Sequence, residues 1–247
     1  MKSPSADRPP EPPAPAAAPP AVALLSGGLD STVALALAQE RGPIALALTI
    51  DYGQRAAARE IERSAALARH FGVAHRVVAL PFFAELPGGG ALLDRALELP
   101  RPDRATLERG GRAVEASAAR VWVPNRNGVF VEVAAAFAEA LGAGRVVVGF
   151  NREEAATFPD NSLGYLKALD GALAYSTRGH VRVEAPTGAL DKAAIVAAAA
   201  SRRLPLDVIW PCYEGGAAPC ATCESCQRFL RACERAGVAA PWAPAAG

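Results

Sequence analysis

Short apolar runs alternate along the chain with longer segments of helix-forming residues. An uninterrupted apolar run of this length is typical of a strand that is buried on both faces. The predicted strands are residues 21–25, 44–50, 75–80, 145–149 and 181–185. The predicted helices are residues 32–40, 56–70, 130–141, 191–201 and 224–235. Because strands separated by helix-length segments pair in parallel with right-handed crossovers, the pattern predicts an α/β fold built on a parallel sheet.

Two segments depart from this alternation. Residues 81–119 are rich in Pro, Gly and charged residues with only modest helical patches, which predicts an insertion over the edge of the sheet. Residues 1–20 hold eight of the 21 prolines, and this Pro/Ala-rich composition predicts a disordered tail. We therefore expect three parts: the tail at 1–20, an α/β domain at 21–205, and a C-terminal module at 206–247.

The charge balance and the cysteines narrow the class of protein. Lys and Arg number 26 against 25 Asp and Glu, which gives a formal charge of +1. Proteins that hold nucleic acid usually present a basic field, so we expect no nucleic-acid partner. The apolar runs are far shorter than the roughly 20 residues that span a bilayer, so we expect no membrane span. Clustered cysteines without an export signal favour metal binding in a reducing, cytoplasmic compartment.

The turn after the first predicted strand reads Ser-Gly-Gly-Leu-Asp-Ser, residues 26–31. Open parallel sheets bind ligands at such turns, outside the carboxyl ends of their strands. The glycines let backbone N–H groups approach an anion, Ser26 and Ser31 add hydroxyl donors, and the following helix points its positive end there. The turn therefore predicts a phosphate-chain site, with a plain strand-to-helix turn as the alternative. It matches neither a Walker loop nor the dinucleotide G-x-G-x-x-G motif.

Four cysteines near the C-terminus have the spacing of a metal site. Their pattern is C-x7-C-x2-C-x2-C, formed by Cys212, Cys220, Cys223 and Cys226. Four thiolates complete the tetrahedral shell of Zn²⁺ and leave no position for water, so the spacing predicts one structural zinc ion per chain. The alternative is buried or disulfide-paired cysteines. Cys233 lies outside the spacing and is predicted to be a spare thiol.

Three features of the sequence resemble those of known families. The 26–31 loop resembles the pyrophosphate loop of the N-type ATP pyrophosphatases. The turn Asp-Tyr-Gly-Gln-Arg, residues 51–55, resembles the second motif of the 7-cyano-7-deazaguanine synthases, and the same C-terminal cysteine arrangement occurs in them. The resemblance runs from Leu24 to about Arg231. It implies a Rossmann-like fold of the adenine nucleotide alpha hydrolase type, with ATP and Mg²⁺ as co-substrate.

The resemblance also implies roles for residues around ATP. The implied catalytic residues are Asp30, Ser31 and Lys192, with Asp30 helping to place the magnesium and Lys192 near the phosphates. The implied ATP contacts are Leu25, Ser26, Gly27, Gly28, Leu29, Asp30, Ser31, Thr32 and Asp51.

A second set of residues is predicted to contact the other substrate. Arg126 can pair with a carboxylate as a two-pronged donor. A carboxylate at Glu153 or Asp160 suits the N–H donors of a guanine-like edge, and Phe130 or Phe158 can stack on its face. The full predicted set is Tyr52, Gln54, Arg55, Arg126, Asn127, Phe130, Glu153 and Asp160.

The implied reaction converts 7-carboxy-7-deazaguanine and ammonia to 7-cyano-7-deazaguanine through an acyl adenylate and an amide, with release of AMP and pyrophosphate. The resemblance also suggests a homodimer. The chain departs from the family pattern at Ala56, where a histidine is common, and at 158–162, which reads Phe-Pro-Asp-Asn-Ser in place of Tyr-Pro-Asp-Cys-Arg. The second departure leaves open a relative that joins the deazaguanine acid to another amine, such as a protein terminus.

Two further alternatives belong to other classes. A tRNA-thiolating ATP pyrophosphatase would need a reactive cysteine near the nucleotide and a basic surface, and the sequence indicates neither. A zinc-ribbon binding module on a nucleotide-sensing domain would be no enzyme, and the near-zero net charge disfavours it.

Overall fold

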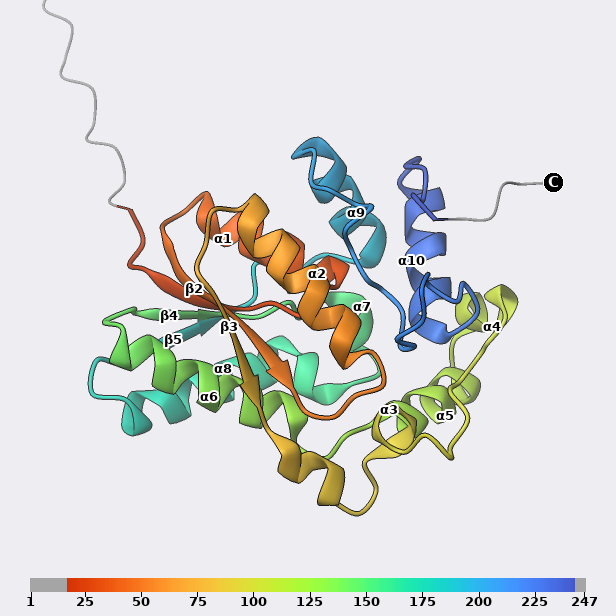
Figure 1. Cartoon of the computed structure of the whole chain (residues 1–247), viewed down its shortest axis with the longest axis horizontal. Helices are drawn as coiled ribbons and strands as arrows, with labels where there is room; N and C mark the ends of the chain where they lie inside the picture. Colours follow the sequence, from red (N-terminus) through yellow and green to blue (C-terminus); the bar gives the residue numbers. More distant parts are fainter. Residues whose placement is uncertain (1–16, 243–247) are drawn as a thin grey trace, which may run out of the picture.

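The structure of the chain, a computed structural model, describes residues 17–242. The predicted disorder of the tail therefore falls largely outside the described residues. Five parallel strands form one sheet in the order β3-β2-β1-β4-β5 (Figure 1). The strands are β1 Ala21–Leu24, β2 Ile44–Asp51, β3 His75–Ala79, β4 Arg145–Val147 and β5 Arg182–Glu184. The predicted α/β fold with a parallel, Rossmann-like sheet is confirmed.

Helices cover both faces of the sheet. They are α1 Leu29–Gln39, α2 Ala57–His70, α3 Gly90–Leu93, α4 Arg104–Arg109, α5 Arg112–Val121, α6 Arg126–Ala140, α7 Arg152–Ala155, α8 Leu163–Ser176, α9 Lys192–Ser201 and α10 Glu224–Arg235, with short 3-10 turns η1 Pro81–Glu85 and η2 Pro159–Asn161. Helices α1 and α2 lie on one face, and α6 and α8 lie on the other (Figure 1). Among the described residues, no helix is long and apolar enough to cross a bilayer.

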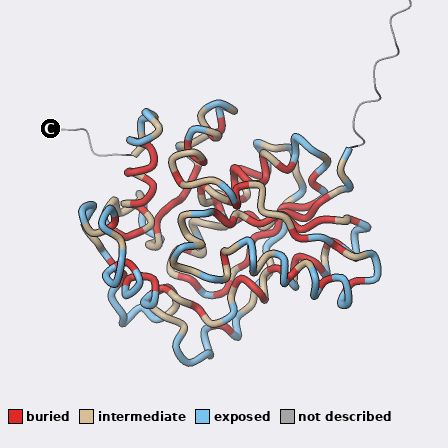
Figure 2. The backbone as a smooth tube through the Cα atoms, turned by 180° about the vertical axis from the view of Figure 1, so that it is seen from behind, coloured by how far each residue is buried: buried red, intermediate tan, exposed pale blue. Residues whose placement is uncertain are grey.

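The alternation of side chains in β1 explains why the strand is apolar throughout. Val22 packs with the α6 and α8 side chains, whereas its neighbours Ala21 and Ala23 pack with α1 and α2. All three residues are fully buried, and Figure 2 shows the buried residues running along the strands. Successive strand residues point to opposite faces, so a strand covered on both sides must be apolar at every position.

Several helices begin elsewhere than the sequence predicts. Helix α1 begins at Leu29 instead of 32, inside the glycine turn. Helix α6 begins at Arg126 instead of 130, directly after Asn125, whose left-handed backbone (φ 50°) asparagine tolerates better than most residues. Helix α8 was not predicted; Ser162 caps it by accepting a hydrogen bond from the Tyr165 N–H.

The 81–121 segment and the C-terminal segment pack against each other. The insertion carries η1, α3, α4 and α5, and α10 contacts it through a hydrogen bond from Glu224 N–H to the Pro100 carbonyl. Helix α10 also packs on α9 and α1 through an apolar cluster that includes Phe229 and Ile195. The C-terminal segment therefore joins the insertion to the sheet, and the boundary at 205 stays a prediction.

Candidate active site at the carboxyl edge of the sheet

The glycine turn forms the open N-terminus of α1. Ser31 Oγ accepts a hydrogen bond from the Ser26 N–H at 3.2 Å and lies 3.1 Å from Ser26 Oγ. Thr32 Oγ1 donates to the Gly28 carbonyl at 2.7 Å. No side chain caps the helix at Gly28, so its first N–H groups remain available. An uncapped helix start with two hydroxyls beside it is a ready site for an anion.

Two glycines are required for this shape. Gly27 has φ 77°, and a Cβ atom there would also lie 3.1 Å from the Glu60 carbonyl oxygen. A Cβ atom on Gly149, just after β4, would lie 2.6 Å from the Ser31 nitrogen. The backbone after β4 therefore touches the backbone of the turn, and only glycine permits that approach.

A cluster of three charges lies beside the turn; we call it the cleft cluster. Lys192 Nζ bonds Asp30 Oδ2 and lies 2.7 Å from Glu154 Oε1, and the Lys192 side chain is 10% exposed. Burial raises the pKa of Asp30 to about 6 against the opposing effect of Lys192. The two carboxylates outweigh burial and raise the pKa of Lys192. Asp30 Oδ1 is buried and has no partner among residues 17–242, so the cluster keeps one acceptor for a ligand or cation.

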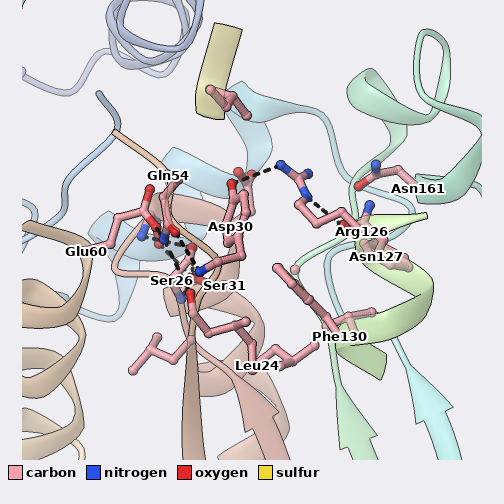
Figure 3. Close-up of a pocket in the computed structure, with 18 of the residues that line it drawn as sticks. Leu24, Ser26, Asp30, Ser31, Gln54, Glu60, Arg126, Asn127, Phe130 and Asn161 are labelled. Atoms are coloured by element: carbon pink, nitrogen blue, oxygen red, sulfur yellow. Dashed lines mark hydrogen bonds between the residues drawn. The ribbon is translucent and has the colours of Figure 1, made fainter. Parts of the chain in front are cut away.

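Arg126 lies across the cavity from the turn. Its Nη1 donates to the Tyr52 hydroxyl at 3.3 Å, and its Nε donates to Asn127 Oδ1 at 3.4 Å. Phe130 packs edge-on against the Tyr52 ring, with centroids 5.3 Å apart. Figure 3 shows Arg126, Asn127 and Asn161 on one side and Ser26, Ser31 and Glu60 on the other. A basic, aromatic wall therefore faces the anion site.

Two adjoining cavities of about 250 and 220 Å³ occupy the space between these walls. They share the wall residues Ser26, Gly28, Asp30, Glu60, Leu92, Arg126, Glu154, Asn161 and Tyr213. The shared residues mark a junction at the carboxyl edge of the sheet, where parallel sheets bind ligands. The two cavities form one cleft that can hold two substrates side by side.

Most residues predicted for the site line this cleft. They are Leu25, Ser26, Gly28, Leu29, Asp30, Ser31, Tyr52, Gln54, Arg126, Asn127, Phe130 and Lys192. The other predicted residues, which are not among those lining it, are Gly27, Thr32, Asp51, Arg55, Glu153 and Asp160.

The side chains of Arg55 and Glu153 have other partners. Arg55 donates to the carbonyls of Asp94 and Leu97 and so fixes the insertion. Glu153 pairs with Arg228 and Arg231 of α10. These placements count against direct substrate contacts for the two residues.

Three other predicted residues act on the backbone or lie just beside the cleft. Thr32 ties the glycine turn through Gly28, and Asp51 Oδ1 accepts the Gly53 N–H at 3.1 Å. Asp160 is next to Asn161, which does line the cleft. Burial raises the pKa of Asp160, and the smaller effect of Arg126 lowers it.

Sequence reasoning missed four polar residues that line both cavities: Glu60, Glu154, Asn161 and Tyr213. Glu154 is adjacent to the predicted Glu153, and a helix of four residues offers too short a pattern to choose between neighbours. Glu60 lies in the first turn of α2, five residues beyond the end of the 51–55 motif. Burial raises the pKa of Glu60 to about 7.

The four predicted cysteines come together. The Sγ atoms of Cys212, Cys220, Cys223 and Cys226 all lie within 4.8 Å of one another and can hold a metal ion. The N–H groups of Glu214 and Cys220 each donate to Cys212 Sγ at 3.3 Å. Cys212 also borders the second cavity, a proximity to the cleft that the sequence did not indicate.

Cys233 lies apart from the four cysteines. It is buried in the apolar cluster between α9 and α10, and burial raises its pKa to about 11. This placement agrees with a spare thiol outside the metal site.

Comparisons with known proteins identify the family of the chain. The model of the family described as queuosine biosynthesis protein QueC matches residues 20–237. The 7-cyano-7-deazaguanine synthase of Pelotomaculum thermopropionicum is 50% identical over 217 residues, 88% of this chain and 97% of that protein. The 7-cyano-7-deazaguanine synthase of Desulforudis audaxviator is 51% identical over 216 residues, 87% of this chain and 97% of that protein.

Among solved structures, the U34-tRNA thiolase NcsA from Methanococcus maripaludis has a TM-score of 0.46 and 14% identity, and the match covers 86% of this chain and 64% of that one. No function follows from so distant a match. The family model and the curated relatives, in contrast, span nearly the whole described chain. The chain belongs to the family of the queuosine biosynthesis protein QueC and is an enzyme of that family.

Proposed function

We propose that the chain converts 7-carboxy-7-deazaguanine and ammonia to 7-cyano-7-deazaguanine and cleaves ATP to AMP and pyrophosphate. The observation that carries the proposal is the cleft itself, in which an anion site at 26–31 faces Arg126 across one cavity system. The carboxylate of the acid must reach the phosphate chain of ATP, so the sites that bind the two groups have to face each other. Family membership and the names of the curated relatives support the same reaction.

The first step activates the acid. A carboxylate is a poor electrophile, so its oxygen attacks the α-phosphorus of ATP and pyrophosphate leaves, which gives an acyl adenylate. The departing pyrophosphate is held by the N–H groups of the α1 start and by the hydroxyls of Ser26 and Ser31. Lys192 adds positive charge beside them. The free Oδ1 of Asp30 fits Mg²⁺, which neutralises charge on the phosphates.

The acid occupies the opposite wall. Arg126 offers a guanidinium that pairs with the carboxylate, and Tyr52 and Asn127 hold that guanidinium in place. Phe130 provides an aromatic surface for the deazaguanine ring, and Asn161 adds an amide at its edge. Glu153 is paired with α10, whereas Glu154 lines the cleft together with Asn161, and Asp160 Oδ1 accepts a hydrogen bond from Asn161 Nδ2 at 3.4 Å.

Nitrogen enters after adenylation. Ammonia displaces AMP to give the amide, a second ATP adenylates the amide oxygen, and loss of AMP leaves the nitrile. Positioning and electrostatic stabilisation carry these steps without a covalent enzyme intermediate. None of the chain's three histidines is among the residues that line the cleft, and this proposal takes free ammonia as the nitrogen source.

We also infer that the four cysteines hold one structural Zn²⁺. Tetrahedral zinc with Zn–S bonds of about 2.3 Å separates sulfur atoms by about 3.8 Å. Cys220 Sγ and Cys226 Sγ lie 4.0 Å apart, which fits. Four thiolates fill the shell, so the ion holds the module together and leaves the chemistry to the cleft. Reduced cysteines also favour the cytoplasm.

The test is a single incubation of purified protein with ATP, ammonia and 7-carboxy-7-deazaguanine. We expect the nitrile by mass spectrometry, together with AMP and pyrophosphate. ADP and phosphate as the only nucleotide products would contradict the proposal. A product in which the acid is joined to another amine would favour the alternative that the 158–162 departure leaves open.

A further inference from the structure

The proposed reaction needs a proton acceptor at the nitrogen. Ammonia carries three N–H bonds, and the nitrile nitrogen carries none, so each turnover must remove three protons from one nitrogen atom. Water is a weak acceptor at neutral pH, and a carboxylate or imidazole within hydrogen-bond reach usually performs this task. The roles assigned above to Lys192, Arg126 and the 26–31 turn leave this task unassigned.

Glu60 is the carboxylate at the cleft junction that no cation binds. Its Oε2 accepts a hydrogen bond of 2.7 Å from Gln54 Nε2, a neutral amide. Among the described residues, no hydrogen bond or ion pair reaches its Oε1, and Glu60 lines both cavities. Figure 3 shows Glu60 and Gln54 next to Ser26, at the phosphate side of the cleft. Glu60 therefore presents a free oxygen where the two substrates meet.

The other titratable groups of the junction are already engaged. Asp30 and Glu154 both bond the Lys192 ammonium, and the second oxygen of Asp30 is assigned above to Mg²⁺. The three histidines, His70, His75 and His180, line neither cavity. Tyr213 lines both cavities, but burial raises its pKa well above the ordinary value.

We propose that Glu60 is the general base of this enzyme and accepts the N–H protons as ammonia becomes the amide and then the nitrile. This inference rests on the proposed function. In the first transfer, the nitrogen lone pair forms the C–N bond to the acyl carbon and one N–H proton passes to Glu60 Oε1. The C–O bond to the adenylate breaks, and AMP leaves with its electron pair. Glu60 returns the proton to solvent and accepts one more at each later step.

Gln54 positions this base. Its Oε1 accepts the Tyr52 N–H at 3.0 Å, and its Nε2 also donates to the Ile50 carbonyl at 3.3 Å. The amide is therefore fixed by the backbone at the end of β2 and holds the carboxyl of Glu60 at one angle. An amide donor neither supplies nor removes a charge, so Glu60 stays free to gain and lose a proton.

The groups facing Glu60 come from several elements. Burial raises the pKa of Glu60 to about 7, Gln54 and the Arg126 guanidinium of α6 lower it, and Asp51 at the end of β2 raises it. The cleft cluster of α1, α7 and α9 shares the wall. Near neutral pH both forms of Glu60 are populated, which suits a base that must be reused.

The test separates adenylation from nitrogen transfer. Exchange of labelled pyrophosphate into ATP, in the presence of the acid and without ammonia, reports adenylation alone. We expect E60Q to keep this exchange within a few-fold of the parent and to lose ammonia-dependent turnover by about 10² to 10⁴-fold. Retained exchange also shows that the variant is folded. E62Q, on the same helix but exposed and paired with Arg59, is the matched control and should keep both activities.

Two further readouts identify a base. At a constant concentration of free NH3, parent turnover should rise with pH through about 7, as Glu60 ionises, and E60Q should lack that rise. Hydroxylamine, a stronger nucleophile that is neutral at pH 7, should trap the acyl adenylate in E60Q at nearly the parent rate. Equal loss of exchange and turnover in E60Q would overturn the inference, as would full turnover. If the parent itself shows no exchange, the proposed function fails and this inference with it.

Discussion

Two adjacent glutamates of α7 belong to two different clusters of charge. Glu154 joins Lys192 and Asp30 in the cleft cluster. Glu153 joins Arg228 and Arg231 in what we call the α10 cluster, which also contains Glu224 and Ser117. Both clusters are largely buried, and both connect segments far apart in the sequence.

The clusters differ in how completely their polar atoms are paired. In the α10 cluster, Glu224 accepts from Arg228 and Ser117, and Arg231 bonds both Glu153 and the Leu107 carbonyl. In the cleft cluster, Asp30 Oδ1 has no partner in the part of the chain that the structure describes, and the three charges border a cavity. A saturated cluster holds elements together, whereas an incomplete one beside a cavity is suited to a ligand. Two neighbouring glutamates therefore differ in role: Glu153 connects elements of the fold, whereas Glu154 borders the cleft.

The largest effect should come from removing two of the cysteines that hold the start of α10, the helix that carries the α10 cluster. Cys223 is the N-cap of α10 and Cys226 lies in its first turn. Replacing both by Ser should abolish metal binding, a loss on the order of 10 kcal/mol, and should melt the C-terminal segment while the sheet persists. Elemental analysis and circular dichroism measure the two effects. Cys233→Ser should keep the metal, and zinc retained in the double variant would refute the metal site.

The second test removes the cation of the cleft cluster. Lys192→Met leaves Asp30 and Glu154 unpaired beside the phosphates, and we expect kcat to fall by about 10³-fold. Steady-state assays at saturating ATP measure the change. Lys167→Met, at an exposed position of α8, is the matched control. Turnover that survives the loss of Lys192 would remove the cleft cluster from the proposed mechanism.

The third test unpairs the α10 cluster without touching the metal. Arg228→Met leaves Glu224, which is 1% exposed, with one partner fewer, and leaves Glu153 with Arg231 alone. We expect the free energy of unfolding to fall by about 3 kcal/mol, because a buried carboxylate loses its cation. Urea denaturation measures it, with the exposed Arg235→Met as control. If kcat also falls under conditions in which the Arg228→Met variant remains folded, the α10 cluster also acts on the cleft.

The last prediction concerns how the free energy of unfolding depends on pH. Glu60 has a pKa of about 7, above the ordinary 4.5, so the folded chain binds this proton more tightly than the unfolded chain. Its contribution to the free energy of unfolding is therefore largest below about pH 4.5 and falls as the pH rises to 7, by about 2 kcal/mol. Urea denaturation at pH 5 and 7.5 should show this slope in the parent and a smaller one in E60Q. Identical slopes would contradict it.

The sheet and the glycine turn could be predicted because their signals are local. The apolar run at Ile44–Asp51 and the glycine turn each report their own conformation, since a doubly covered strand has no polar face and Gly27 needs a positive φ. The four cysteines are equally local, with their spacing confined to 15 residues, 212–226.

The remaining parts of the site depend on contacts across the sequence. Arg55 was predicted to contact substrate, but the carbonyls of 94–97 hold it, and no pattern within 51–55 reveals that loop. The choice between Glu153 and Glu154 depends on where α10 lies, some 75 residues later. Helix α8 contains Gly164 and Gly171, which lower helix propensity, and its burial on the sheet compensates for that loss.

The close approach of Gly149 to Ser31 has a consequence for how variants of this enzyme would be interpreted. Any side chain at 149 must displace the backbone of the glycine turn, although replacing Gly149 by alanine adds no charge and removes no hydrogen-bond donor. Loss of activity there would mimic a damaged catalytic group while every catalytic group is intact. In a set of natural or engineered variants, substitutions of Gly149 should therefore lower activity as much as substitutions of Asp30, for steric reasons alone.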